Sequence, residues 1–75
     1  MPWRLSAYAR ALRSWNVDVV DTGEGRHPFK AVRDGKSFPF KAHNGMRSEI
    51  SDAYINPLCR CFGIEVAEFR KKLSE

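Results

Sequence analysis

Two histidines, His27 and His43, are the candidates for acid–base chemistry in this 75-residue chain, because imidazole exchanges protons near neutral pH. Both lie in its most basic segment, residues 26–47, in which Asp34 is the single acid. The six cations of this segment are Arg26, Lys30, Arg33, Lys36, Lys41 and Arg47. The segment's net charge of +5 exceeds the +4 of the whole chain, so we expect a local positive field that suits a polyanion such as nucleic acid.

A histidine beside cations can cut RNA without a metal ion. A base removes the proton of a ribose 2′-hydroxyl, and the resulting oxyanion attacks the adjacent phosphorus. His27 is the candidate base, while Arg26, Lys30 and Lys41 are candidates for holding the phosphate. If the side chains of Arg26 and His27 come close, the guanidinium disfavours protonation of the imidazole and keeps it a competent base.

Each of these residues also has a simpler interpretation. His27 could be an ordinary polar residue at the start of a strand, and the basic segment could be a solvated strand face that protects a sheet edge. His43 is either the acid that protonates the leaving 5′-oxygen or a loop residue beside Asn44 that contacts phosphate or nothing. Arg47 is a further candidate for contact with RNA.

The composition predicts one small soluble domain spanning residues 1–75, close to the size limit at which burial outweighs chain entropy, so a homodimer or a bound partner is plausible. No apolar run is long enough for a membrane helix, and the first residues lack an apolar signal core, which predicts a cytoplasmic protein. Cys59 and Cys61 are read as structural thiols, since one intervening residue suits neither a disulfide nor a complete metal site. We expect no metal and no cofactor.

The hydrophobic pattern predicts the helices and strands that position these residues. Apolar residues at spacings of three and four predict a helix over 2–14, and a run rich in β-branched residues predicts a strand over 17–21. Two further strands, 28–33 and 37–42, flank Asp34-Gly35, a pair that favours a type I′ hairpin turn.

Helical spacing returns in the second half of the chain. It predicts a helix over 51–62 that stops at Gly63, and a short helix over 65–73. Pro57 leaves two alternatives open: Ser51 caps a helix that kinks at Pro57, or a turn over 48–55 leads to a short helix capped by Asn56. The expected fold is α+β, with a three-stranded antiparallel sheet, helices on one of its faces, and a short C-terminal helix.

This α-β-β-β-α order is that of double-stranded-RNA-binding domains, and the local residues resemble a narrower group. Residues 23–29 look like the Gly-x-Gly-Ser-His motif, followed by an aromatic residue, of the HicA-type toxins, with Arg26 in place of the serine and Pro28 directly after the histidine. Residues 38–43 resemble the third strand of these toxins, and residues 49–64 resemble their final helix with its Gly-Ile end. Residues 65–75 lie beyond the similarity.

The resemblance implies a ribosome-independent mRNA endoribonuclease, the toxin of a toxin–antitoxin pair, which a HicB-type antitoxin inhibits. The family's functional histidine corresponds to His27. Two other functions remain open on the residues alone: a non-catalytic RNA-binding module that uses the same basic face, and an interaction domain that docks an acidic protein.

Overall fold

The computed structural model describes residues 3–23, 28–42 and 45–75. The described chain contains three eight-residue α-helices, five short strands and three 3₁₀ helices. In order, the elements are β1 (Trp3–Arg4), α1 (Leu5–Leu12), the 3₁₀ helix η1 (Arg13–Trp15), β2 (Asp18–Asp21), β3 (Phe29–Arg33), β4 (Lys36–Phe40), η2 (Gly45–Arg47), β5 (Glu49–Ile50), η3 (Asp52–Tyr54), α2 (Ile55–Phe62) and α3 (Val66–Leu73).

The main sheet is antiparallel and has the order β2-β3-β4. Strand β3 pairs with β2 from Phe29 opposite Asp21, and with β4 from Phe29 opposite Phe40. Asp34 and Gly35 connect β3 to β4 with φ angles of 49° and 81°. Two successive positive φ values are those of a type I′ turn, whose twist matches that of the flanking strands. The predicted hairpin is therefore confirmed.

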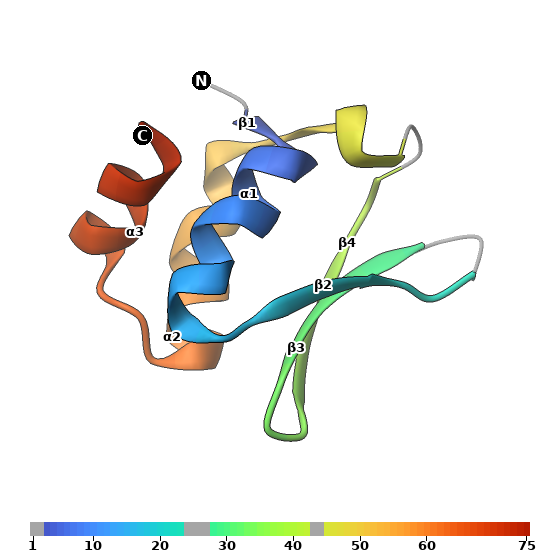
Figure 1. Cartoon of the computed structure of the whole chain (residues 1–75), viewed down its shortest axis with the longest axis horizontal. Coiled ribbons are helices and arrows are strands. Elements are labelled where there is room, and N and C mark those ends of the chain that lie inside the picture. Colours follow the sequence, from blue (N-terminus) through green and yellow to red (C-terminus); the bar gives the residue numbers. More distant parts are fainter. Residues whose placement is uncertain (1–2, 24–27, 43–44) are drawn as a thin grey trace.

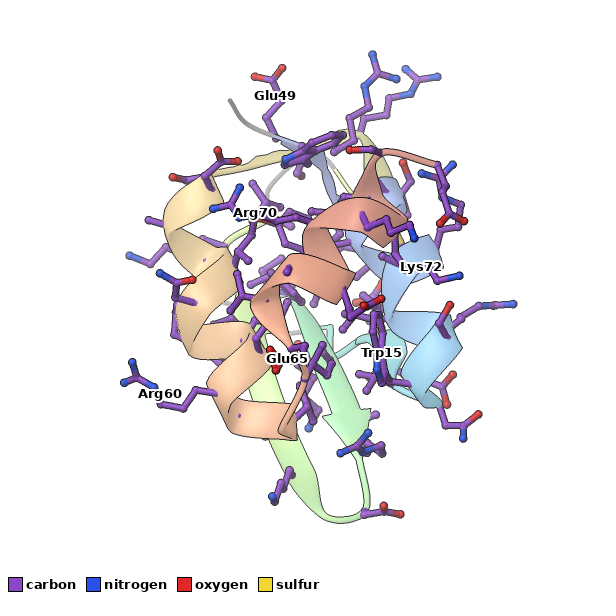
Figure 2. The ribbon with its side chains drawn as sticks, turned by 90° about the vertical axis from the view of Figure 1, so that its left-hand side faces the viewer. Trp15, Glu49, Arg60, Glu65, Arg70 and Lys72 are labelled. Atoms are coloured by element: carbon purple, nitrogen blue, oxygen red, sulfur yellow. The ribbon has the colours of Figure 1, made fainter. Side chains whose placement is uncertain are left out.

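Helices lie on one face of this sheet (Figures 1 and 2). Helices α1 and α2 cover the sheet, and α3 packs across their outer side. The α+β class and the three-stranded antiparallel sheet agree with the expectation from sequence.

The core between the layers is built around aromatic side chains. The Tyr8 ring of α1 lies 5.8 Å from the ring of Phe40 and 5.7 Å from that of Phe69. Phe40 also stacks on Tyr54, with a centroid separation of 6.1 Å and an interplanar angle of 12°. The Tyr8 hydroxyl donates a hydrogen bond to the carbonyl of Ser51 at 3.0 Å. Burial, assisted by the charge of Asp52, raises the pKa of Tyr8, so this donor stays protonated.

The first helix is shorter than the predicted range 2–14. Residues 3–4 form β1, which pairs antiparallel with β5 through Trp3 opposite Ile50 and Arg4 opposite Glu49, and residues 13–15 tighten into η1. The backbone N–H of Leu5 donates to the carbonyl of Ser48 at 2.8 Å, so the second half of the chain satisfies the start of α1. The sequence analysis missed this small sheet, because a pairing across more than 40 residues leaves no trace in a local pattern.

The predicted strand 37–42 is shifted to 36–40, since β4 begins directly after the two-residue turn and pairs with β3 only as far as Phe40.

The single helix predicted over 51–62 is in fact two elements. The Ser51 side chain accepts a hydrogen bond from the N–H of Ala53 at 3.2 Å and caps η3, after which α2 begins at Ile55. Pro57 thus stands in the first turn of α2, where an N–H is not needed for a helical bond. Each of the two alternatives was right in part. Ser51 is a cap, although of η3, and a short helix begins near Pro57, but Asn56 lies inside this helix and its N-cap is Tyr54.

Candidate nucleic-acid interface

Hydrogen bonds hold the backbone on both sides of residues 24–27, the segment that contains Arg26 and His27. The N–H of Thr22 donates to the carbonyl of Pro28 at 2.7 Å, and the N–H of Gly23 donates to the Asp21 carboxylate at 2.8 Å. Gly23 has a φ of 73°, a conformation that favours glycine. These contacts extend the β2–β3 ladder beyond its last pair. Arg26, His27 and His43 themselves lie outside the described residues, so their predicted roles stay predictions.

Alternation along the strands divides the main sheet into an inner face against the helices and a solvent-facing outer face. Ala31 and Phe40 are buried on the inner face. The outer face is formed by Asp18, Val20, Lys30, Val32, Ser37 and Pro39. Val20, whose side chain is 37% exposed, Lys30 and Pro39 form one row across it. This face is therefore a partly apolar surface with a cation at its centre.

Lys30 and Lys41 lie toward the same end of this face, the end at which the chain segment containing residues 24–27 connects β2 to β3. Lys30 is opposite Pro39. Lys41 directly follows β4 and lies two positions after Pro39, on the same side of the alternating backbone. Lys41 is exposed and Lys30 is half-buried, and neither ammonium has an ion pair or hydrogen bond within residues 3–23, 28–42 and 45–75. Both charges are free to meet an anion.

The structure places the third described candidate, Arg47, elsewhere. Arg47 ends η2, which packs against α1, and its side chain is exposed. It therefore belongs to the helix layer rather than to the outer face of the sheet. Sequence proximity to the other cations did not predict this, because the chain leaves the sheet after β4.

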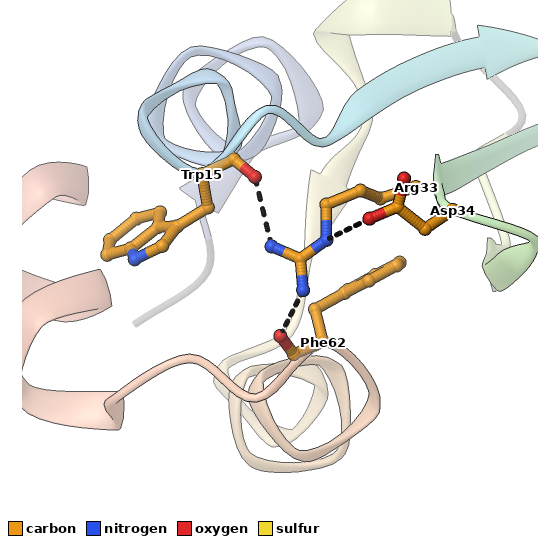
Figure 3. Close-up of polar contacts among 4 residues, drawn as sticks. All are labelled: Trp15, Arg33, Asp34 and Phe62. Carbon is orange, nitrogen blue, oxygen red and sulfur yellow. Dashed lines mark hydrogen bonds and ion pairs between the residues drawn. The ribbon is translucent and has the colours of Figure 1, made fainter.

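Arg33 is a structural residue, although it counts toward the basic segment (Figure 3). Its guanidinium donates to the carbonyl of Trp15 at 3.0 Å and to that of Phe62 at 2.6 Å. It also lies 5.7 Å from the Phe62 ring centre and 3.9 Å from the carboxylate of the exposed Asp34. The two carbonyls stand at the C-terminal ends of η1 and α2, where backbone acceptors lack helical partners and the helix dipole favours a cation. Arg33 thus ties β3 to two helix ends.

Neighbouring strands also change the local charge. Strand β2 brings Asp18 and Asp21 alongside β3, so the six cations counted in sequence face two further acids in space. Together with the engagement of Arg33, this leaves a more modest positive field over the sheet than the segment's charge of +5 predicts.

The sequence analysis did not single out Lys36 and Ser37, which contribute to a surface groove at the hairpin. This groove of about 390 Å³ is also lined by Lys30 and Val32, and it continues the outer face toward the turn. The alternation of β4 already placed Ser37 on the solvent side. Only the fold brings Lys30 and Lys36, which belong to different strands, close together.

The described residues offer no metal centre: no three side chains among their His, Cys, Asp and Glu lie together. Cys59 is buried, and burial raises the pKa of its thiol, while the Cys61 thiol lies 3.7 Å from the carbonyl of Ser37. Cys59 is thus part of the core, and Cys61 lies where α2 packs against β4.

No protein-family model matches the chain, and comparisons with curated proteins and with solved structures find no match either. None of the helices in the described part of the chain has the length and apolar character needed to span a membrane.

Proposed function

We propose that this protein is a metal-independent endoribonuclease of the cytoplasm, a HicA-type toxin that binds mRNA on the outer face of its sheet and cleaves it with His27 as the general base. One observation carries the proposal. The connection that contains His27 is closed by the 2.7 Å hydrogen bond between Thr22 and Pro28, at the same end of the sheet at which Lys30 and Lys41 present unpaired charges.

The chemistry follows from this arrangement. Lys30 and Lys41 attract the phosphate and stabilise the charge that develops on it, while His27 accepts the proton of the 2′-hydroxyl. The 2′-oxygen forms a bond to phosphorus as the bond to the 5′-oxygen breaks. The products end in a 2′,3′-cyclic phosphate and a 5′-hydroxyl, and DNA, which lacks the attacking hydroxyl, is not cut. Arg26 and His43 are proposed to add contacts to the RNA, whereas Arg47 would reach only RNA that extends beyond the sheet to the helix layer.

A second candidate function is a non-catalytic RNA-binding module on the same face. The described part of this face supports it, because Lys30 lies there beside the exposed Val20, while both histidines of the chain lie outside the described residues. Catalysis therefore depends entirely on residues 24–27 and 43–44. Under either function, a HicB-type antitoxin is the proposed protein partner.

The test is to express the wild type and the variants His27→Ala and His43→Ala, and to incubate each with RNA in the presence of EDTA. We expect the wild type to arrest growth and to leave cyclic phosphate ends. His27→Ala should lose at least about a hundredfold in cleavage rate, the lower range for removing a general base. Its midpoint of thermal unfolding should stay within about 2 °C, because the proposal assigns His27 to catalysis and not to the core.

Three results would count against the nuclease. They are continued toxicity of His27→Ala, a strict requirement for magnesium, and products with 3′-hydroxyl ends. RNA that binds to the wild type in a salt-dependent way without being cut would favour the binding module instead.

A further inference from the structure

A second basic surface lies on the helix layer, away from the sheet. Ser6, Ala9, Arg10 and Arg13 recur every three or four residues and thus share one face of α1 and η1. With Met46 of η2 they line a groove of about 350 Å³. We call this feature the α1 groove. The sequence analysis did not name its arginines as candidates for binding.

The residues that line the α1 groove include two arginines and no acid. Residues 3–15 and 45–48 contain Arg4, Arg10, Arg13 and Arg47 but no Asp or Glu. The nearest acid along these segments is Glu49, which is the strand partner of Arg4. Unlike the sheet, where β2 supplies two acids, the groove itself is lined by uncompensated arginines.

The two arginines of the groove differ in how they are held. The Arg10 guanidinium donates to the carbonyl of Leu73 at 3.2 Å, which fixes it at the junction of α1 and α3 while leaving most of its donors unused. Arg13 is exposed, and its guanidinium has no hydrogen bond or ion pair with any other described residue. The pair therefore combines one guanidinium that is held in place, that of Arg10, with one that is free, that of Arg13.

The groove also has an apolar side. Met46 is 40% exposed, and together with Val20 it is one of the two large hydrophobic side chains exposed in the described chain. Ser6 and Ala9 are small, so the backbone of a partner can approach α1 closely. An exposed methionine beside small residues is typical of surfaces that bind protein.

We propose that the α1 groove binds an acidic segment of a partner protein, with one apolar side chain over Met46 and Ala9 and two carboxylates on Arg10 and Arg13. Planar guanidinium forks match carboxylates in bidentate geometry. Arginines three positions apart on a helix lie about 5–6 Å apart at Cβ, a spacing that two acids on one turn of a partner helix reproduce. RNA meets the same charges but supplies no aliphatic side chain to cover Met46. Since this groove is on the helix layer, the protein can hold such a partner and RNA together.

The probe is a fluorescently labelled, acetylated 12-residue peptide that presents a leucine flanked by glutamates three positions apart. A matched peptide with glutamine for each glutamate tests the role of charge. Binding is measured by anisotropy, and the contact surface by the NMR shifts of the Met46 methyl and the Ala9 amide. We expect the acidic peptide to move both signals and the glutamine peptide to bind at least about tenfold more weakly, as loss of one charge-assisted contact predicts.

The matched pair of variants is Arg13→Glu and Arg60→Glu. Both exchange an exposed helix arginine for the same acid, but Arg60 is on α2 and points away from α1 (Figure 2). Arg13→Glu should weaken binding of the acidic peptide by at least about tenfold and Arg60→Glu by less than about twofold. Met46→Ser, which keeps the charges, should weaken binding several-fold.

The proposal is overturned if the Met46 and Ala9 signals do not move, if the glutamine peptide binds as well, or if the two charge reversals have equal effects. It is also overturned if a 12-nucleotide single-stranded RNA moves these signals and loses affinity with Arg13→Glu while the peptide does not. Circular dichroism of each variant verifies that the fold is kept. None of these outcomes depends on whether the wild type cleaves RNA.

Discussion

The two faces of the main sheet use the same stretch of sequence in opposite ways. On the inner face, Phe40 and Ala31 are buried and the Arg33 guanidinium is occupied by two helix ends. On the outer face, the Lys30 ammonium has no hydrogen bond or ion pair with the described residues, and Val20 is exposed. Two cations of one strand, Lys30 and Arg33, are thus a free charge and a structural contact. The difference teaches that a cation count along a segment overstates the surface available to a ligand.

The largest expected effect is on the inner face. Phe40→Ala removes a fully buried ring that contacts Tyr8, Phe38 and Tyr54, so it should lower the free energy of unfolding by about 3–5 kcal/mol. The measurement is urea denaturation followed by tryptophan fluorescence. Its neighbour on the outer face is the control, and Pro39→Ala should cost less than about 1 kcal/mol. Equal losses for the two variants would remove the distinction between the faces.

An intermediate effect is expected at Arg33. Arg33→Met keeps much of the side-chain volume but leaves the carbonyls of Trp15 and Phe62 without their charged donor. Each such bond is worth about 1.5–3 kcal/mol, and because the side chain is partly exposed we expect a total loss of about 2 kcal/mol. Lys36→Met, at the exposed strand position opposite Arg33, should change stability by less than about 0.5 kcal/mol. If Arg33→Met were as stable as Lys36→Met, the structural role of Arg33 would be refuted and its guanidinium would become a candidate for phosphate contact.

The smallest effect on stability is expected on the outer face. Lys30→Ala should leave the free energy of unfolding within about 0.5 kcal/mol of the wild type. Under the proposed function, it should weaken RNA binding and reduce the slope of log K against log salt by about one. The matched control is Lys71→Ala on α3, which should leave this slope unchanged. A slope that Lys30→Ala does not alter would move the RNA site away from the outer face.

Local chemistry made much of the fold predictable. Asp34-Gly35 specified the hairpin because few residue pairs accept two positive φ values, and β-branched and aromatic alternation located the strands. The spacing of Phe69 and Leu73 located α3. Each of these signals acts between residues that are neighbours in sequence.

The candidate site was less predictable for the same reason. Lys30 lies on the outer face of β3 and Lys41 directly follows β4, whereas Arg47, the third described candidate for contact with RNA, lies on the helix layer. The predicted roles of Arg26, His27 and His43 are still predictions, since these residues lie outside the described part of the chain.

The sequence alone determined the class of fold, the hairpin and the order of helices, since turn chemistry and hydrophobic period are local properties. Only the tertiary structure decided that Trp3 and Arg4 pair with β5, that Arg33 joins two helix ends, and that Arg10, Arg13 and Met46 border one groove. Partners in these contacts are separated by about 18 to 47 residues in the chain. Which of them meet depends on how the layers pack, and no local pattern records it.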